Sequence, residues 1–246
     1  MRLASLKQGR DGALVVVRRD GRAWARAAEI RPTLQAALDD WSVTEPALRD
    51  LQRRLDVGDI PGEPLDPTAL AAPLPRGYEW LDGSTFLPHV ERVRRARNVP
   101  LPPRFREEPL VYQGGSGAFL GPTDPVPLAA PGFGLDVEAE LVAITTDVPM
   151  PCGSRDAVSR VALLGLCNDL TLRGLVADEL AKGFGFVVSK PATQLAPFVV
   201  TPDELGPRWR DGRASLTVTV DLDGRRLGAC DSGEAHFGFG ELIAHI

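Results

Sequence analysis

The chain has 246 residues, of which 43% are hydrophobic and 25% charged, a balance typical of one or two folded domains and not of a disordered chain. Its net charge of −5 argues against a nucleic-acid-binding surface, and its longest apolar run, residues 161–167, is too short to cross a bilayer. No signal segment opens the sequence and three widely spaced cysteines suggest no disulfide framework, so we expect a cytoplasmic protein that neither enters a membrane nor binds nucleic acid.

The chain begins with a pattern typical of a β-hairpin. Residues 13–17 form a β-branched run, Asp20 and Gly21 supply a turn, and residues 22–27 return as a second strand. Because 22 prolines and 25 glycines are scattered without a repeat, we expect many turns and few long helices in the rest of the chain.

Two helices and a proline-rich stretch follow the hairpin. Thr33 is a suitable N-cap for the first helix, and leucines at helical spacing predict a second helix over residues 45–55. Residues 61–75 show neither a helix nor a strand period, and we interpret them as a surface linker. The predicted domains are therefore residues 1–75 and residues 76–246.

The second domain combines short strands with few helices, which predicts a β-rich α+β fold. Arginines are dense over residues 89–97, which we expect to form a short helix. The remaining expected elements are strands at residues 110–113, 135–145, 184–189 and 198–201, an apolar segment at residues 160–175, and a hairpin over residues 215–227 with its turn at Asp223 and Gly224.

Acidic residues alternate with apolar ones along the expected strand at residues 135–145. Side chains of a strand alternate between its faces, so Asp136, Glu138 and Glu140 share one face. Three carboxylates on one face repel one another. Two interpretations stay open: the face is solvated, or two of the carboxylates hold a divalent cation, which prefers carboxylate oxygens.

Two further positions suggest chemistry and also have ordinary explanations. Asp169 follows the apolar run 161–167 and is expected to be buried, where a carboxylate needs a partner, although it could also be a turn residue. Asp82 stands seven positions before His89, but alone the first predicts a turn with Gly83 and the second a structural histidine.

Taken together, these segments resemble the fumarylacetoacetate hydrolase family. The resemblance rests on the order and spacing of Asp82 with His89, Glu138-Ala139-Glu140, Asn168-Asp169 with Arg173, and the Lys-Gly-Phe-Gly segment that begins at Lys182. The N-terminal part resembles the small domain of the two-domain branch of that family. The resemblance implies a small barrel-like and helical N-terminal domain followed by a mixed β-sheet, or β-roll, catalytic domain.

The family's activity implies roles for particular residues. Family members hydrolyse a carbon–carbon bond in β-diketo acids such as fumarylacetoacetate and acylpyruvates, and they dimerise, so we expect such a substrate and a homodimer. By position, a divalent cation (Mg²⁺, Mn²⁺ or Ca²⁺) is expected on Asp82, Glu138, Glu140 and Asp169.

The remaining roles concern water and the organic substrate. His89 would activate water, a task that suits the near-neutral pKa of imidazole. Arg173 and Lys182 would stabilise the enolate-like leaving group. Tyr112 and Arg97 would contact the substrate, although Arg97 could equally be a solvated charge on its helix.

The sequence departs from the family at its end. Two-domain relatives continue into a Gly-x-Gly-Thr segment beyond the position of Ile246, whereas this sequence stops after an apolar stretch, residues 240–246. We therefore expect the C-terminal part of the catalytic domain to be missing. The alternative function is a truncated or repurposed member that binds metal or an oxo acid without turnover.

Overall fold

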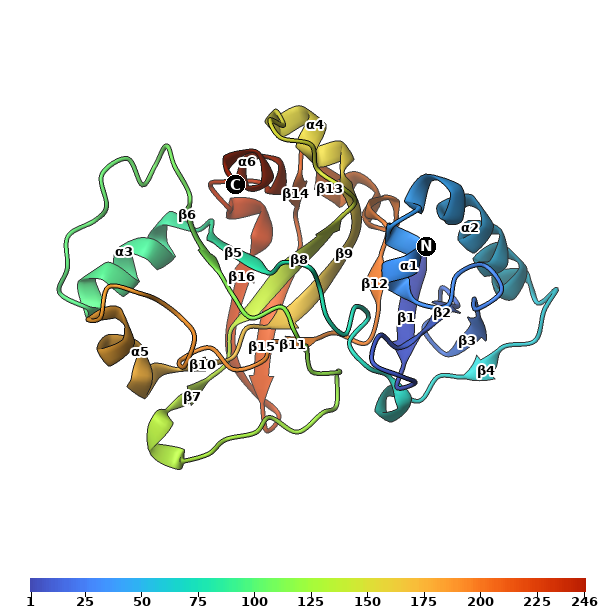
Figure 1. Cartoon of the computed structure of the whole chain (residues 1–246), viewed down its shortest axis with the longest axis horizontal. Helices are drawn as coiled ribbons and strands as arrows, with labels where there is room; N and C mark the ends of the chain where they lie inside the picture. The colour runs from blue at the N-terminus through green and yellow to red at the C-terminus, as the bar shows by residue number, and fades with distance from the viewer.

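The computed structural model describes all residues, 1–246, as two lobes that lie side by side along the long axis of the molecule (Figure 1). The N-terminal lobe carries strands β1 (Arg2–Leu6), β2 (Ala13–Val17), β3 (Ala23–Arg26) and β4 (Glu63–Pro64), with helices α1 (Leu34–Leu38) and α2 (Trp41–Val57). Its sequence explains these elements: β2 ends in three consecutive β-branched valines and has four of its five residues buried. Thr33 caps α1 by accepting a hydrogen bond from the Ala36 amide, as predicted.

The stretch at residues 61–75 is not the surface linker that its prolines suggested. Its strand β4 pairs with β3 at the edge of the sheet, where a proline is tolerated. Leu70 and Ala72 are fully buried, and the Lys7 amide donates to the Ala69 carbonyl. The stretch lacks a helix or strand period because single apolar side chains, rather than a continuous face, fix it to the lobe.

The C-terminal lobe is built on β8 (Ala139–Thr145) and β9 (Val161–Asn168), with β11 (Gln194–Leu195) and β12 (Val199–Val200) along the other edge of β9. Four two-stranded ribbons surround this centre: β5 (Leu81–Ser84) with β6 (Leu110–Gln113), β7 (Leu135–Asp136) with β10 (Thr171–Leu172), β13 (Trp209–Arg210) with β14 (Arg213–Ala214), and β15 (Thr217–Leu222) with β16 (Arg225–Asp231). The helices are α3 (Leu87–Ala96), α4 (Ser154–Ser159), α5 (Arg173–Leu180) and α6 (Phe239–His245), and short 3₁₀ turns lie at Pro67–Ala69, Pro131–Phe133, Pro202–Arg208 and Ser232–Glu234.

Two predicted strands of this lobe differ from the structure. The strand expected over residues 135–145 is interrupted between β7 and β8, because the Glu138 amide donates to the Asn168 side chain and the Val137 amide to the Asp136 side chain. The segment at residues 184–189 is a loop. The Glu179 carboxylate accepts hydrogen bonds from the amides of Val187 and Val188, which thereby lack a strand partner.

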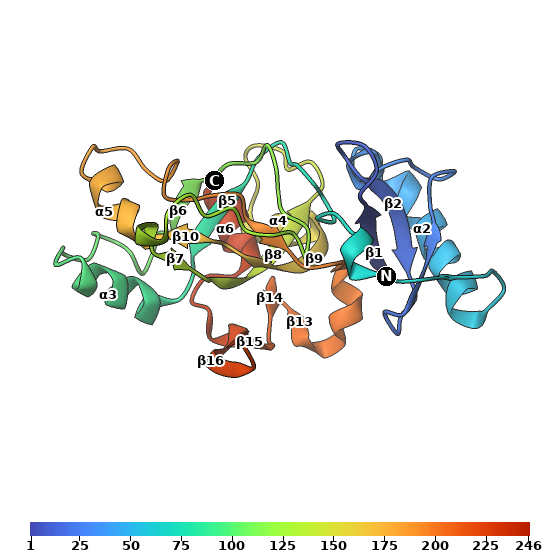
Figure 2. The ribbon, with the colours of Figure 1, turned by 90° about the horizontal axis from the view of Figure 1, so that it is seen from below.

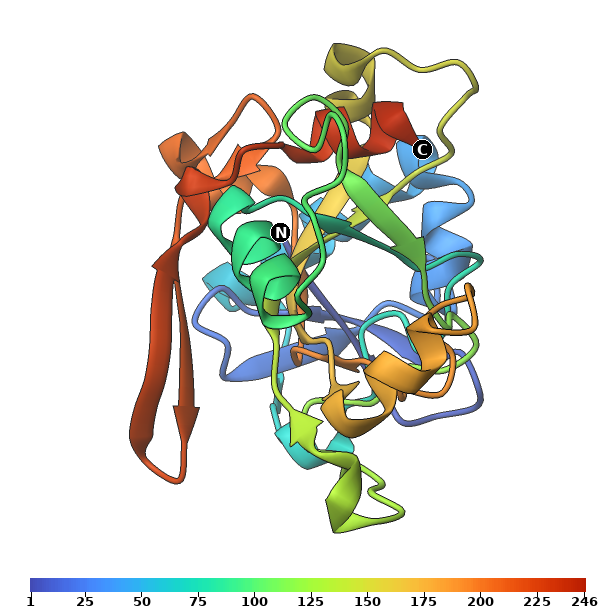
Figure 3. The ribbon, with the colours of Figure 1, turned by 90° about the vertical axis from the view of Figure 1, so that its left-hand side faces the viewer.

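The predicted hairpin at residues 215–227 is confirmed as β15 and β16, with its turn at Asp223 and Gly224. It projects away from the lobe, below it in Figure 2 and to the side in Figure 3. All seven residues of β16 are exposed, so the hairpin contributes little to the core.

A single antiparallel sheet joins the two lobes. β12 pairs with β1 of the N-terminal lobe and with β9 of the C-terminal lobe. Buried side chains of both lobes, including Leu3 and Leu163, pack in one core cluster.

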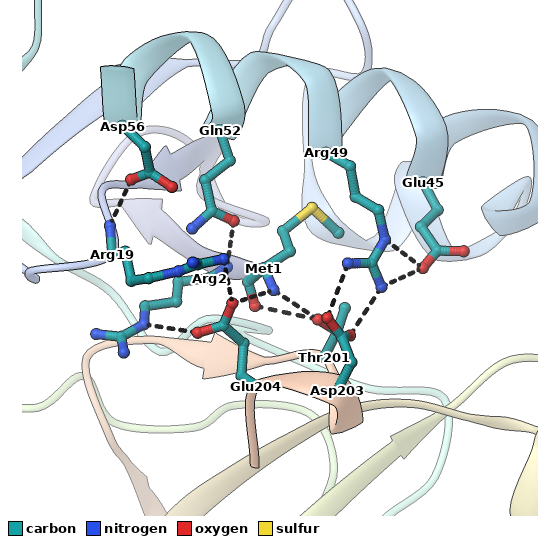
Figure 4. Close-up of polar contacts among 10 residues, drawn as sticks. All are labelled: Met1, Arg2, Arg19, Glu45, Arg49, Gln52, Asp56, Thr201, Asp203 and Glu204. Carbon is teal, nitrogen blue, oxygen red and sulfur yellow. Dashed lines mark hydrogen bonds and ion pairs between the residues drawn. The ribbon is translucent and has the colours of Figure 1, made fainter. Parts of the chain in front are cut away.

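Polar contacts beside this cluster also join the two lobes (Figure 4). The Met1 amino group donates to Thr201 (2.6 Å) and Glu204 (3.0 Å), and Arg49 of α2 forms an ion pair with Asp203 (2.8 Å). The lobes are therefore held by the hydrogen bonds of a shared sheet, an apolar cluster and ion pairs rather than connected by a free linker alone. None of the helices combines the length and apolarity that a bilayer crossing requires.

Candidate metal centre

Three carboxylates that are distant in sequence meet in the C-terminal lobe. Asp82, Glu140 and Asp169 each place an oxygen within 4.8 Å of the oxygens of the other two. Strand pairing brings them together: Asp82 lies on β5 opposite Tyr112 of β6, and Glu140 lies on β8 opposite Cys167 of β9. Asp169 follows the end of β9, where its amide donates to the Glu138 carbonyl (2.9 Å).

The position of β5 depends on a glycine. The C-terminal helix α6 lies across this strand, and a Cβ on Gly83 would come 2.6 Å from a methyl group of Leu242. Such a separation is far inside van der Waals contact. The absence of a side chain at Gly83 therefore leaves room for Leu242 of α6 against the strand that carries Asp82.

Asp169 is the most buried member of the cluster, with 1% of its surface exposed. Its Oδ1 accepts from the Thr193 hydroxyl (2.7 Å), and its Oδ2 accepts from the Tyr112 hydroxyl and from the Lys190 ammonium (2.6 Å each). Burial alone would raise the pKa of Asp169, but the Lys190 charge and these hydrogen bonds hold it below its ordinary value. Asp169 is therefore an ionised carboxylate in a buried place.

The other two carboxyl groups behave differently. Burial, followed by the Asp169 charge, raises the pKa of Asp82 to about 6. Burial and the charges of Asp82, Asp169 and Glu138 raise the pKa of Glu140 to about 9. At neutral pH without a cation, Glu140 therefore holds a proton, because another negative charge in the cluster would have too little positive charge nearby.

Glu138 lies beside the cluster with its carboxylate turned to three other groups. It accepts from Lys190 (2.7 Å), from the Thr171 hydroxyl (2.8 Å) and from Arg173. The structure thus brings three of the four expected ligands together and engages the fourth in ion pairs. The role of Glu138 as a metal ligand therefore remains a prediction.

The expected water-activating and substrate-contacting residues line the pocket above this cluster. His89 on α3, Tyr112 on β6, Arg97 and Arg173 all line it together with Asp82 and Glu140. Partial burial lowers the pKa of His89, and the neighbouring arginines act in the same direction while Glu138 opposes them. His89 is therefore a neutral imidazole at physiological pH, as a base must be.

Arg97 and Arg173 form the cationic side of the pocket. Arg173 pairs with Asp136 (2.8 Å) and with Glu138, whereas Arg97 forms no ion pair within 4 Å. Burial and the Arg173 charge lower the pKa of Arg97. Two guanidinium groups beside one another favour an anion between them.

Two expected site residues, Asp169 and Lys182, are absent from the pocket lining; Asp169 is buried within the carboxylate cluster, whereas Lys182 belongs neither to the cluster nor to the pocket. Lys182 is exposed in the turn after α5. The lysine that does reach the cluster is Lys190, which sequence reasoning missed. The available signal was its rarity: the chain has three lysines, Lys7, Lys182 and Lys190, among 28 Lys and Arg residues, and Lys190 lies shortly after the Lys-Gly-Phe-Gly segment that begins at Lys182.

Comparison with known proteins identifies the family. Residues 80–246 match the fumarylacetoacetate (FAA) hydrolase C-terminal family, and residues 1–76 match fumarylacetoacetase N-terminal domain 2. The chain belongs to the fumarylacetoacetate hydrolase family. The resemblance inferred from the spaced motifs is thereby confirmed.

Curated relatives of this family member are distant and longer. The fumarylacetoacetase of Oryza sativa subsp. japonica is 28% identical over 208 residues, which cover 75% of this chain and 46% of that protein. The 2,4-didehydro-3-deoxy-L-rhamnonate hydrolase of Sphingomonas sp. (strain SKA58) is 26% identical over 152 residues, which cover 61% and 49%. The chain spans about half the length of these two relatives.

Solved structures of similar chains confirm the β-rich α+β fold. A putative HpcE protein from Mycobacterium smegmatis has a TM-score of 0.71 at 21% identity, with 99% of this chain and 80% of that chain covered. The maleylpyruvate hydrolase from Sphingobium sp. SYK-6, solved with manganese(II) and pyruvate, has a TM-score of 0.67 at 18% identity, with 99% and 81% covered.

The donor set of this family member fits a hard divalent cation. All three convergent donors are carboxylates, and Mg²⁺, Mn²⁺ and Ca²⁺ prefer oxygen ligands. Burial and the neighbouring carboxylates raise the pKa values of Asp82 and Glu140, and a dication among these oxygens would oppose both shifts. The buried thiol of Cys167 lies 4.0 Å from Glu140 and its pKa is raised, chiefly by burial, so it is not a thiolate ligand.

Proposed function

We propose that the chain hydrolyses a carbon–carbon bond in a β-diketo acid of the fumarylacetoacetate or acylpyruvate type. The observation that carries this proposal is the convergence of Asp82, Glu140 and Asp169 at a pocket whose lining includes the first two of these residues, His89, Arg97 and Arg173. Two similar proteins, a fumarylacetoacetase and a maleylpyruvate hydrolase, support this substrate class.

The three convergent carboxylates would hold Mg²⁺, Mn²⁺ or Ca²⁺, and Glu138 could join them after leaving its ion pairs. When bound, the cation supplies Lewis-acid polarisation of the substrate's oxygens. Tyr112, whose hydroxyl donates to Asp169, fixes that ligand from the pocket side. The protein's part is to place the substrate's two oxygens above the carboxylates.

The side chains above the cluster would perform the remaining steps. His89 would take a proton from water, since its lowered pKa keeps the imidazole neutral. Arg97 would bind the carboxylate of the substrate, and Arg173 would stabilise the enolate that leaves when the carbon–carbon bond breaks. We keep Lys182 as a further candidate for the enolate, which requires its turn to move toward the pocket, and we expect a homodimer as in relatives.

Turnover tests the proposal directly. The purified chain is incubated with Mg²⁺ or Mn²⁺ and a panel of acylpyruvates and fumarylacetoacetate, and loss of the conjugated enol absorbance is followed. We expect turnover in the wild type, none in His89→Ala, and full activity in His236→Ala. His236 is a matched control because its ring contacts the Arg106 carbonyl and lies outside the pocket.

Two results would change the assignment. Turnover that survives His89→Ala removes that residue as the base. Binding of Mn²⁺ and pyruvate without turnover of any compound in the panel supports the alternative of a non-catalytic member that holds an oxo acid.

A further inference from the structure

A lysine ammonium lies between two of the four expected metal ligands. The Nζ of Lys190 is 2.6 Å from Asp169 Oδ2 and 2.7 Å from Glu138 Oε2. The side chain is 10% exposed, and its ammonium also lies 5.6 Å from the centre of the Tyr112 ring. A buried charge held by two charged partners at these distances is a strong ion pair.

The contacts of Asp169 leave little room for a second cation. A carboxylate has about four lone-pair sites. Thr193 takes one on Oδ1, and Tyr112 with Lys190 takes both on Oδ2. A cation bound to Oδ2 of Asp169 at the usual oxygen distances would lie within about 5 Å of the ammonium, where like charges repel strongly in a buried site.

We propose that Lys190 is an internal cation that competes with the divalent cation for Asp169 and Glu138, so that metal binding displaces its ammonium group. The proposal rests on the metal site of the proposed function. Lysine suits this role because its charge is compact and its stem has several rotatable bonds, so the ammonium can leave without moving the backbone. Lys190 thereby sets the concentration at which the site fills.

If Lys190 only supported its neighbours, removing it would change the metal affinity in the opposite direction. If Lys190 only held Asp169 in place, its removal would loosen the ligand and weaken metal binding. Asp169 keeps two other donors, Thr193 and Tyr112, in the absence of the lysine. Competition therefore predicts that removal of the ammonium tightens metal binding.

The first experiment compares the dissociation constant of Mn²⁺, measured by isothermal titration calorimetry, in four proteins. We expect Lys190→Met to bind Mn²⁺ at least tenfold more tightly than the wild type, and Lys190→Arg, which keeps the charge, to show no tightening. Lys7→Met is the matched control, because Lys7 pairs with Asp124 and not with the cluster. An unchanged or weaker affinity in Lys190→Met overturns the proposal.

A second experiment uses the wild type and is independent of how well the variant folds. Lysine labelled with ¹³C at the ε position gives three resonances, since the chain has three lysines. Because the Lys190 ammonium lies over the Tyr112 ring, we expect its resonance to be displaced from the free-lysine position, and we expect Mg²⁺ to move it back while the Lys7 resonance stays. A Lys190 resonance that does not move when Mg²⁺ saturates the site refutes displacement.

The two experiments separate the inference from the function on which it rests. If Mn²⁺ and Mg²⁺ bind to none of the four proteins, the proposed metal site and the competition both fail. If the wild type binds metal but neither the affinity nor the resonance changes as stated, only the role of Lys190 fails.

Discussion

The same substitution at the two glutamates of the Glu138-Ala139-Glu140 segment should change the free energy of unfolding in opposite directions. Both are expected metal ligands, yet Glu138 is paired with Lys190 and Arg173, whereas Glu140 has no cationic partner within 4 Å. Replacement of each by glutamine removes the charge and keeps the shape. In the metal-free chain we expect Glu140→Gln to stabilise and Glu138→Gln to destabilise.

The effect at Glu140 follows from its raised pKa. Consider a carboxyl group whose pKa is higher in the folded chain than in the unfolded chain. The protein has its full stability at pH values below the unfolded-state pKa and loses stability as the pH rises toward the folded-state pKa. For Glu140 this window extends from 4.5 to about 9. Each pH unit lowers the free energy of unfolding by up to about 1.4 kcal/mol, so the wild type loses about 3 kcal/mol by pH 7. Glutamine does not titrate, so the variant avoids this loss.

The effect at Glu138 has the other sign. Burial opposes ionisation there, but the charges of Lys190 and Arg173 and the hydrogen bonds lower the pKa of Glu138 below its ordinary value. The contribution of ionised Glu138 to protein stability is therefore complete at pH values above its unfolded-state pKa, and it is lost as the pH falls through its folded-state pKa. Glu138→Gln at pH 7 leaves Lys190 with one charged partner and should cost about 1–3 kcal/mol.

Thermal unfolding in the presence of EDTA at pH 5, 7 and 8.5 measures both effects. For a chain of this size, about 3 kcal/mol corresponds to a rise of roughly 6–12 °C in Tm for Glu140→Gln at pH 7. The gain over the wild type should grow with pH. A Glu140→Gln variant that is less stable than the wild type at all three pH values would refute the claim that Glu140 is buried without a countercharge.

Three further predictions concern the metal, a helix contact and a loop. Because Glu140 holds its proton at pH 7, Mn²⁺ binding should release about one proton, measured by calorimetry in buffers of different ionisation enthalpy; release of none contradicts the raised pKa. A Cβ on Gly240 would lie 2.4 Å from the Ser154 carbonyl oxygen, so Gly240→Ala should detach α6 from α4 and cost about 1–3 kcal/mol in urea unfolding, while Gly115→Ala, with open space around it, should not. Glu179→Ala removes the acceptor for the amides of Val187 and Val188, and limited proteolysis should then cut the loop at residues 183–188 faster than in the wild type; an unchanged rate means that other contacts hold it.

Local patterns predicted the elements that carry their own signal. The strand at residues 13–17, the cap at Thr33 and the hairpin turn at Asp223 are each encoded within a few residues, and the structure contains all three. The interruption of the strand at residues 135–145 depends on the Asn168 side chain, some 30 positions away. No period within the strand could have predicted it, because the hydrogen bond that breaks the strand comes from elsewhere in the fold.

The candidate site divides in the same way. The spacing of Asp82, the Glu-x-Glu segment and Asp169 identified a family, and the structure brings Asp82, Glu140 and Asp169 together. Which carboxylates are charged could not be read from that spacing, because it depends on which cations reach them. The assignment of Lys182 rested on a matched motif, and only the folded chain shows that Lys190 is the lysine at the carboxylates.

The charge balance of the cluster links the fold to the proposed chemistry. The pairing of β8 with β9 places Glu140 opposite Cys167, two residues before Asp169, and the pairing of β5 with β6 places Asp82 opposite Tyr112, whose hydroxyl donates to Asp169. Lys190 and Arg173 together balance the charges of Asp169 and Glu138, whereas burial and these neighbouring carboxylates raise the pKa values of Asp82 and Glu140. A dication that enters such a cluster replaces protons and an ammonium rather than creating the site. The chain therefore folds with the ligands already in place, and metal affinity depends on pH and on Lys190 rather than on a folding step.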